Sequence, residues 1–564
     1  MQNSEHTLLL LLVPKIKLDL ALRLVDCSAC LSRYSICGEC YQYSLSSRVF
    51  FGRNICVCVL TRVDVSAYEE LLTRLKDIDL IRQIGSLLSW DQEVLMPPKA
   101  APLRAEQLAW ISKTAHERLT DARIGEILDE IESNDDMDAI TSANIRLARE
   151  AFDRATKLPT EFVEEMAKHR SKALISWTEA REKDDFSIFR DDLEIAIGHA
   201  RMKADFFGYD GLRYDALLDL YESGLTVERL DPLFSGLREN VAPLIKEVVE
   251  RDEGPDLSWV TESTWSQKAQ EELSQSVSEA IGFDFEAGRR DLSTHPFCGG
   301  PNPDDVRWTT RYSEEEPFGS LFGSMHETGH GTYEQGRPRD LDFQPAGKAN
   351  GLGIHESQSR LWENQIGRSR EFCEWSIPLW RKFFPENMDG VSAEQLWQAV
   401  NLVKPGLIRV DADEATYNLH IMIRYEIEKQ LIAGEIDVDD LPDAWDEMYH
   451  EYLGIRAPNR TLGVLQDIHW SMGAIGYFPT YTLGNLYAAQ LLESARKDLP
   501  EHDTQIREGD FSPLLKWMRD NVHSRGSVLE PAELIKEATG QDPSPDAFIR
   551  YLGSKVERLY GVSA

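Results

Sequence analysis

Residues 318–333 read Phe318-Gly-Ser-Leu-Phe-Gly-Ser-Met-His326-Glu327-Thr-Gly-His330-Gly-Thr-Tyr333, and the rest of the chain is best interpreted outward from this stretch. It contains the pattern His-Glu-x-x-His. Residues four apart share one face of a helix, so His326 and His330 can both point at one ion. Two neutral imidazoles suit zinc, which then needs a third protein ligand and keeps a fourth position for water. Glu327 can act on that water as a general base.

The third ligand is expected downstream. Residues 351–363 read Gly351-Leu-Gly-Ile-His355-Glu356-Ser-Gln-Ser-Arg-Leu-Trp-Glu363, which puts Glu356 26 positions after His330. In zinc peptidases of the glutamate-ligand type, the third ligand is a carboxylate on a second helix. We therefore predict a metal site made of the two histidines and Glu356.

Composition limits the partners that the chain can have. A hydrophobic fraction of 42% with 13 Trp among 564 residues is enough for a large core. The net charge of −35 argues against nucleic acid or an anionic membrane as a partner, because both require a basic surface. After residue 58 the sequence contains two cysteines, Cys298 and Cys373, which is typical of a reduced, cytoplasmic protein.

Residues 1–65 differ from the rest of the chain by being rich in cysteine. Cys27-x-x-Cys30 and Cys37-x-x-Cys40 could form a four-thiolate zinc knuckle, but the six residues between the pairs are few for a zinc ribbon. The leucine run at 8–12 is too short to span a bilayer and lacks a basic segment before it. The alternative is a poorly ordered extension or a mis-assigned start, and an intact mass that includes residue 1 would contradict the latter. We expect the catalytic domain to cover residues 66–564.

Helical periodicity dominates after residue 65. Ser66-Ala-Tyr-Glu69 is a capping box, and apolar residues then recur at helical spacing until the paired prolines Pro97 and Pro98. The same period predicts helices over 104–119, 122–132, 142–156, 159–184, 186–206, 226–250 and 264–281, and again from residue 363 to the C-terminus.

One strand-like region is expected, at residues 283–312. Its alternation and its Pro/Gly turn predict a small antiparallel β-sheet immediately before the His-Glu-x-x-His helix. An edge of that sheet could hold an extended peptide by strand addition. The predicted fold is mainly α, with one large zincin-like helical body and this sheet beside the metal.

Arginines bear on which peptide bond a metal hydrolase would cut. An enzyme that removes C-terminal residues must bind a carboxylate, and arginine does so in a planar, two-pronged manner. Arg307 and Arg409 are the candidates, although each has an acidic residue two positions away and a surface ion pair is the alternative for both.

A glycine-punctuated stretch at residues 463–485 carries further polar groups. His469, Tyr477 and Tyr481 are donors of the kind that stabilise an oxyanion. Gln466 and Asp467 lie in the same stretch, and we expect them to form a buried polar network between helices instead.

Together these motifs resemble the carboxypeptidase Taq family of zinc carboxypeptidases. The resemblance extends from about Tyr68 to the C-terminus, and residues 1–65 depart from it. The motifs that carry it occur in this order: Trp90-Asp-Gln, His295-Pro-Phe, Asp305-x-Arg307-x-Thr309, His326-Glu327-x-x-His330, His355-Glu356-Ser-Gln, Ile408-Arg-x-x-Ala-Asp413 and Gly463-x-x-Gln-Asp-x-His469-Trp470.

The resemblance implies a bean-shaped helical fold with a deep active-site groove, usually as a homodimer. It implies Zn²⁺, which Co²⁺ can replace, held by His326, His330 and Glu356, with Glu327 as general base and then proton donor. The partners would be peptide substrates with a free C-terminus, which lose single residues with broad side-chain preference. The candidate substrate-binding residues are His295, Asp305, Arg307, Thr309, Arg409, His469, Tyr477 and Tyr481.

Two other functions remain open from the sequence. An all-helical zinc oligopeptidase shares the motif but cuts peptides internally, and arginines at the groove floor would argue against it. A non-catalytic helical protein that binds peptides, or merely holds structural zinc, is a further alternative. The intact Glu327 argues against this last class, because a degenerate enzyme would be expected to lose that residue first.

Overall fold

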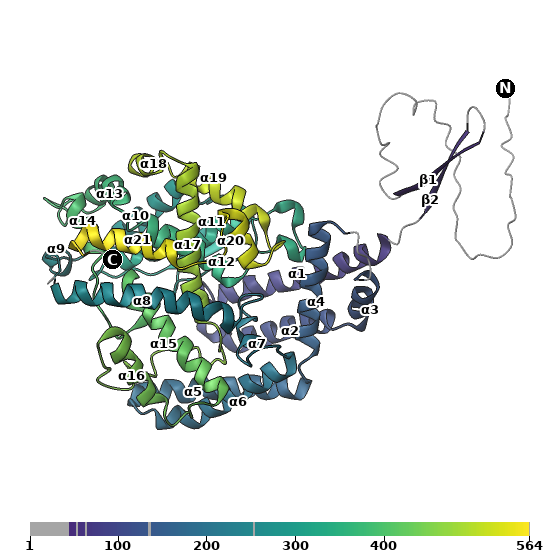
Figure 1. The fold of residues 1–564 in the computed structure, drawn as a ribbon, viewed down its shortest axis with the longest axis horizontal. Helices are drawn as coiled ribbons and strands as arrows, with labels where there is room; N and C mark the ends of the chain where they lie inside the picture. Colours follow the sequence, from purple (N-terminus) through teal and green to yellow (C-terminus); the bar gives the residue numbers. More distant parts are fainter. Residues whose placement is uncertain (1–43, 52–54, 62–64, 133–136, 252–253, 563–564) are drawn as a thin grey trace.

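The computed structural model describes residues 44–51, 55–61, 65–132, 137–251 and 254–562, and it is mainly α-helical as predicted (Figure 1). Within these residues, no helix is both long enough and apolar enough to cross a membrane. The helices are α1 Val65–Val94, α2 Ala101–Leu119, α3 Ala122–Ile131, α4 Ala139–Thr156, α5 Thr160–Lys183, α6 Ser187–Phe207, α7 Asp215–Leu218, α8 Val227–Arg251, α9 Ser258–Thr261, α10 Gln267–Ile281, α11 Phe318–Gly336, α12 Leu352–Arg360, α13 Arg370–Phe383, α14 Ala393–Val400, α15 Glu414–Ala433, α16 Leu441–Leu453, α17 Pro479–Asp498, α18 His502–Glu508, α19 Ser512–Asn521, α20 Pro531–Thr539 and α21 Asp546–Tyr560.

The helix ends follow local rules that the sequence only partly revealed. Helix α1 begins at Val65, one residue before the predicted cap Ser66, and it ends at Val94, ahead of the paired prolines. Helix α2 begins three residues earlier than expected, because a proline is tolerated in the first turn of a helix, where its missing N–H has no acceptor. Helix α10 begins three residues later than expected, after the extended residue Ser266.

The sheet beside α11 is mixed, so the prediction of an antiparallel sheet was only half correct. Its strands are β3 Gly288–Leu292, β4 Cys298–Asn302 and β5 Asp305–Thr310, in the order β3-β5-β4. Strands β4 and β5 are antiparallel, whereas β3 pairs in parallel with β5. The cause is the connection between β3 and β4, which passes over the end of β5. The hydroxyl of Thr309 anchors both ends of this connection, at Ser293 Oγ (2.6 Å) and at the Phe297 N–H (3.1 Å).

A second pair of strands was missed by the sequence analysis. Strands β1 Ser44–Phe51 and β2 Ile55–Thr61 form an antiparallel hairpin, drawn outside the helical body in Figure 1. Both strands contain β-forming residues, Val49, Phe50 and Phe51 in β1 and Val57 and Val59 in β2, and that signal was available beside the cysteines. The two Cys-x-x-Cys pairs lie in residues outside the described part of the chain, so the zinc-knuckle prediction is untested.

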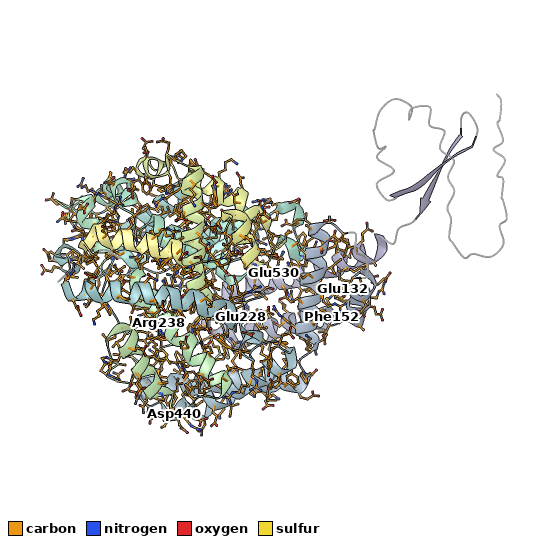
Figure 2. All side chains as sticks on the ribbon, viewed as in Figure 1. Glu132, Phe152, Glu228, Arg238, Asp440 and Glu530 are labelled. Atoms are coloured by element: carbon orange, nitrogen blue, oxygen red, sulfur yellow. The ribbon has the colours of Figure 1, made fainter. Side chains whose placement is uncertain are left out.

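The two largest hydrophobic clusters of the described residues divide the helical body. Helices α1 to α4 share one cluster, whereas the larger cluster joins α5 and α6 to the helices that follow, through α21. Arg146 of α4 binds Glu530, the residue that precedes α20, and so ties the N-terminal helices to the C-terminal part of the chain. Glu530 is labelled in Figure 2. Asn144 of α4 adds a second tie through its hydrogen bond to Gln344 (2.8 Å).

Strand β5 supports the helix that carries the His-Glu-x-x-His motif. Trp308 is fully buried, with its ring edge-on to Phe283 at 6.0 Å between centroids. A Cβ atom on Gly331 of α11 would lie 2.6 Å from the Phe283 ring and 3.6 Å from Trp308, so the helix rests directly on these rings. Ser324 of α11 also donates a hydrogen bond to Thr310 of β5 (3.2 Å). These contacts fix α11 against the sheet.

Replacing Trp308 by alanine removes this support. We expect Trp308→Ala to lower the free energy of unfolding by about 3–5 kcal/mol, because it leaves a large cavity under α11. Trp110→Ala is the control, since that side chain is 67% exposed and its loss should change stability by less than about 0.5 kcal/mol. Chemical denaturation of both variants measures this, and equal effects would contradict the supporting role of Trp308.

Candidate metal centre

The three predicted metal ligands come together between α11 and α12. Nε2 of His326 and Nε2 of His330 are 3.2 Å apart, and Oε2 of Glu356 lies 3.7 Å from the first and 3.6 Å from the second. Ligands held tetrahedrally at about 2.0–2.1 Å from an ion lie roughly 3.3–3.4 Å from one another. The triangle therefore fits a zinc-sized cation with one open corner. Among the described residues, no other group of three histidine, cysteine or carboxylate side chains is arranged for a metal.

The far sides of both imidazoles are held by a second layer of polar groups. Nδ1 of His326 lies 2.9 Å from Oε2 of Glu363. Nδ1 of His330 lies 2.7 Å from Nδ1 of His355, whose Nε2 is 2.9 Å from Oε1 of Glu334. Burial would raise the pKa of Glu334, but its hydrogen bond with His355 and the charge of a nearby arginine lower it to about 2. These contacts leave both Nε2 atoms facing each other and Glu356, as a metal site requires.

Glu356 is oriented by residues of its own helix. Arg360 donates from Nε to Oε1 at 2.6 Å, and Ser359 Oγ donates to Oε2 at 3.1 Å. Arg360 also reaches Glu363 at 3.2 Å and so joins the two carboxylates of this region. With Oε1 occupied by Arg360, Oε2 is the oxygen that faces the histidines.

Glu327 has the properties of a proton acceptor. It is 5% exposed, and its Oε2 has no hydrogen-bond partner among the described residues. Burial raises its pKa to about 7, against the opposing effect of the His326 charge. A metal cation close by would lower this pKa, since positive charge favours the carboxylate.

Backbone packing through two glycines sets the distance between the ligand helices. A Cβ atom on Gly329 of α11 would lie 2.5 Å from the carbonyl oxygen of Gln358 in α12. On the other side of α12, a Cβ atom on Gly484 of α17 would lie 2.7 Å from Cβ of Glu356 and would overlap its Cγ. Helix α12 is thus held between α11 and α17 at distances that a larger residue would not permit.

Arg409 lies in a buried cluster close to the ligands. Its Nε donates to Oδ1 of Asp467 at 3.0 Å and its Nη1 donates to the Tyr417 hydroxyl at 3.3 Å. The Tyr417 ring packs against the Arg360 guanidinium at 4.4 Å, and Arg360 binds the ligand Glu356. Tyr417 and Arg360 therefore connect Arg409, the predicted carboxylate-binding residue, to the predicted ligand Glu356.

The cluster contains more positive than negative charge. Arg424, which is fully buried, takes the other carboxylate oxygen of Asp467 at 2.6 Å, so two guanidinium groups share one carboxylate. Burial lowers the pKa of His469 to about 4 despite the nearby Asp467, which leaves the imidazole neutral at physiological pH. The guanidinium of Arg409 also packs against the Tyr481 ring at 5.2 Å.

Gln466 and Asp467 form the buried polar network that the sequence predicted. The Gln466 side chain accepts from the Arg409 N–H at 3.0 Å and donates to the Leu407 carbonyl at 3.0 Å. It therefore fixes the backbone on which Arg409 is mounted.

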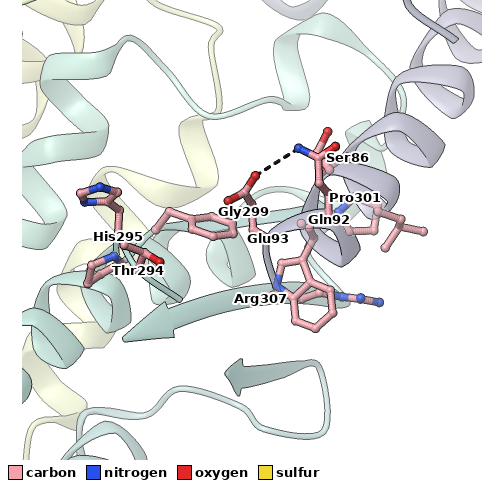
Figure 3. A pocket seen from close by; sticks show the side chains of 14 residues that line it. Ser86, Gln92, Glu93, Thr294, His295, Gly299, Pro301 and Arg307 are labelled. Carbon is pink, nitrogen blue, oxygen red and sulfur yellow. Dashed lines mark hydrogen bonds between the residues drawn. The ribbon is translucent and has the colours of Figure 1, made fainter. Parts of the chain in front are cut away.

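Arg307 has a different environment. It makes two hydrogen bonds to Asp305, at 2.7 and 2.8 Å, and stacks on the Trp90 ring of α1 at 4.8 Å. Strand alternation turns it away from α11, toward a cavity of about 490 Å³ that α1 and residues 294–301 line (Figure 3). His295 borders the same cavity, whereas Thr309 is fully buried and serves the connection between β3 and β4. Direct contact of these residues with a substrate stays a prediction.

Several residues that shape the site did not stand out in the sequence. Arg360 lies one helical turn beyond Glu356, and Glu334 one turn beyond His330, so helical spacing alone could have identified both. Tyr417 and Arg424 reach the site from α15, and no local pattern connects them to the motif.

The glycine packing makes a testable prediction. Gly484→Ala should weaken metal binding by on the order of ten-fold, because the new methyl group displaces Glu356. Gly323→Ala, on α11, is the matched control, since a Cβ atom there would contact nothing within 4 Å. Competition with a chromogenic chelator measures both affinities, and unchanged affinity in the first variant would contradict the packing constraint.

Comparison with known proteins identifies the family. The model of the carboxypeptidase Taq (M32) metallopeptidase family matches residues 70–556. Thermostable carboxypeptidase 1 of Thermus thermophilus is 40% identical over 508 residues, which are 88% of this chain and 99% of the relative. Carboxypeptidase 1 of Bacillus subtilis is 39% identical over 88% of this chain and 100% of its own length. The crystal structure of the M32 carboxypeptidase from Deinococcus radiodurans R1 covers 88% of this chain and 100% of its own, with a TM-score of 0.86 and 38% identity. This chain therefore belongs to the carboxypeptidase Taq (M32) metallopeptidase family.

Proposed function

We propose that the protein is a zinc-dependent carboxypeptidase that removes single residues from the free C-terminus of peptides, with broad side-chain preference. The observation that carries this proposal is the Arg409–Asp467–Arg424 cluster beside the ligand triangle. A metal site alone accounts for peptide hydrolysis, whereas a buried excess of positive charge accounts for the choice of the terminal bond.

Charge balance supports carboxylate recognition. Arg409 and Arg424 together bear two positive charges and Asp467 bears one negative charge, which its two arginine partners stabilise by holding its pKa far below the usual range against the effect of burial. A buried charge without a counter-charge is costly. The terminal carboxylate of a peptide would balance it and bind in a planar, two-pronged manner. A C-terminal amide offers no such charge.

The chemistry proposed at the metal follows from the donor set. Two imidazoles and one carboxylate with an open corner suit zinc, which when bound activates a water and polarises the scissile carbonyl. Glu327 takes the proton from the attacking water and delivers it to the leaving amine. Tyr477 and Tyr481, whose ring centroids are 5.3 Å apart, are the proposed donors to the substrate beside Arg409. Cobalt is expected to replace zinc.

The alternative functions are each opposed by one observation. Internal cleavage by an oligopeptidase gives no role to the positive cluster, because an internal peptide bond has no carboxylate to bind. A non-catalytic peptide-binding protein gives no role to the buried Glu327 oxygen that has no hydrogen-bond partner in the described part of the chain. The homodimer, the deep groove and the cytoplasmic location remain predictions from the resemblance and the composition.

Glu327→Gln tests the general base. We expect kcat to fall by on the order of 10² to 10⁴-fold, because the amide cannot accept the proton. Metal content should stay at one ion per chain, since Glu327 is not a ligand. Glu315→Gln changes an exposed glutamate just before α11 and should leave kcat unaltered. Substantial activity in the Glu327 variant would contradict its role.

A pair of peptides tests carboxylate recognition. One peptide sequence, prepared with a free carboxylate and with a C-terminal amide, is followed by mass spectrometry with and without a chelator. The free form should lose residues one at a time, the amide should be spared, and the chelator should stop the reaction. Internal cleavage of both forms at similar rates would contradict the proposal and favour the oligopeptidase.

Arg409→Met should lower kcat/KM for the free-carboxylate peptide by on the order of 10 to 100-fold, the loss expected for a hydrogen bond between charged groups. Arg190 of α6 is also ion-paired but lies away from the cluster, so Arg190→Met is the control. Equal activity of both variants would exclude Arg409 as the carboxylate ligand.

A further inference from the structure

The first turn of α12 is capped by a distant segment of the chain. The first N–H groups of a helix have no acceptor within the helix, and residue 351, which precedes α12, is a glycine without a side-chain cap. The Leu352 N–H donates to the Tyr221 carbonyl at 3.2 Å, and the Gly353 N–H donates to Oε2 of Glu222 at 2.8 Å. A turn 131 residues earlier in the chain thus supplies both acceptors.

Glu222 is enclosed at this position. The residue is 2% exposed, and the Tyr487 side chain of α17 lies beside its carboxyl group. A Cβ atom on Gly351 would lie 2.9 Å from its carboxyl carbon, and one on Gly353 would lie 2.8 Å from Oε1. Two glycines at the start of α12 therefore make room for this carboxyl group, which no step of the proposed reaction uses.

The cap acts on the same helix face as the metal ligand. Gly353 and Glu356 are three residues apart, so they lie one above the other on α12. Each meets a residue of α17: a Cβ on Gly353 would be 3.0 Å from the Tyr487 ring, and Glu356 packs against Gly484. The Glu222 carboxyl group therefore lies at the first turn of the α12–α17 contact, one helical turn before Glu356.

The turn that contains Glu222 also touches the other wall of the site. The Tyr221 ring packs edge-on against the ring of Tyr477 at 5.1 Å between centroids. The Leu217 carbonyl, earlier in the same segment, leaves no space for a side chain on Gly476, since a Cβ atom there would lie 2.8 Å from it. Residues 217–222 therefore support both α12 and the loop before α17 that carries Gly476 and Tyr477.

We propose that Glu222 is a positioning residue of the metal centre, which caps α12 at Gly353 and thereby holds Glu356 at its distance from His326 and His330. This inference rests on the proposed metal site. Glu222 does not touch the ion or the substrate, so its effect is on ligand geometry and appears first in metal affinity.

The amide of glutamine should replace this carboxyl group. Burial raises the pKa of Glu222 to about 8, against the hydrogen bonds from the Gly353 N–H and the Tyr487 side chain, so the group is mostly neutral near pH 7. A glutamine oxygen can accept from Gly353 in the same way. An alanine has no acceptor, and an aspartate carboxyl group ends one methylene short of Gly353.

The test measures Zn²⁺ affinity of the full chain by competition with a chromogenic chelator. Glu222→Ala and Glu222→Asp should raise the Kd for Zn²⁺ by on the order of ten-fold, as losses of outer supporting contacts do, and Glu222→Gln should restore it to within about three-fold. Asp192→Ala is the matched control, because Asp192 is another buried carboxylate, 4% exposed, whose partner Lys172 lies on α5 and not on α12.

Each outcome decides between the explanations. Wild-type Kd in the alanine and aspartate variants would overturn the positioning role. A ten-fold rise in the Kd for Zn²⁺ in Asp192→Ala as well would assign the effect to lost stability and would also overturn the positioning role. A rise in Glu222→Gln equal to that in Glu222→Ala would exclude the hydrogen-bond cap and overturn the role in the same way. If Glu222→Ala does not fold, the aspartate variant carries the test. A wild-type chain that binds no Zn²⁺ would instead refute the metal site and the proposed function, which is a separate result.

Discussion

The backbone packing of α12 between α11 and α17 is the constraint on which the site depends. Metal ligands on different helices meet only when the helix axes are close, and side chains normally keep axes about 8–10 Å apart. Gly329 and Gly484 remove the side chains at the two contact points, so Glu356 reaches the histidines. The sheet supports α11 from the other side through Trp308. The geometry of the predicted metal site therefore depends on the close packing of three helices.

The buried charged side chains near the site are paired with one another. Acidic and basic side chains near the site occur in chains: Glu334 with His355, Glu363 with Arg360, and Asp467 with two arginines. Each carboxylate satisfies the hydrogen-bonding capacity of a neighbour, as buried polar groups require. Two departures from this rule lie beside the ligand triangle. Among the described residues, one oxygen of Glu327 has no hydrogen-bond partner, and the Arg409–Asp467–Arg424 cluster contains two positive charges and one negative charge. Both are features that the proposed substrate would contact.

The sequence predicted what depends on spacing along one helix and missed what depends on contacts between distant segments. His326 and His330 are one turn apart, and Glu356 follows in a recognisable motif, so the meeting of these three side chains could be predicted, as could most helix positions. The parallel pairing of β3 with β5 was missed because it depends on how Thr309 ties down a connection. Arg424 and Glu222 were missed because they lie on α15 and in a turn before α8, with no pattern that links them to the motif.

A crystal structure of the zinc-loaded protein with a bound product amino acid, measured at the zinc absorption edge, tests the central claim most directly. The account predicts one anomalous peak within about 2.0–2.2 Å of His326 Nε2, His330 Nε2 and Glu356 Oε2, with the product carboxylate on Arg409. A peak elsewhere in the chain, or a product whose carboxylate lies away from the arginine cluster, would contradict it.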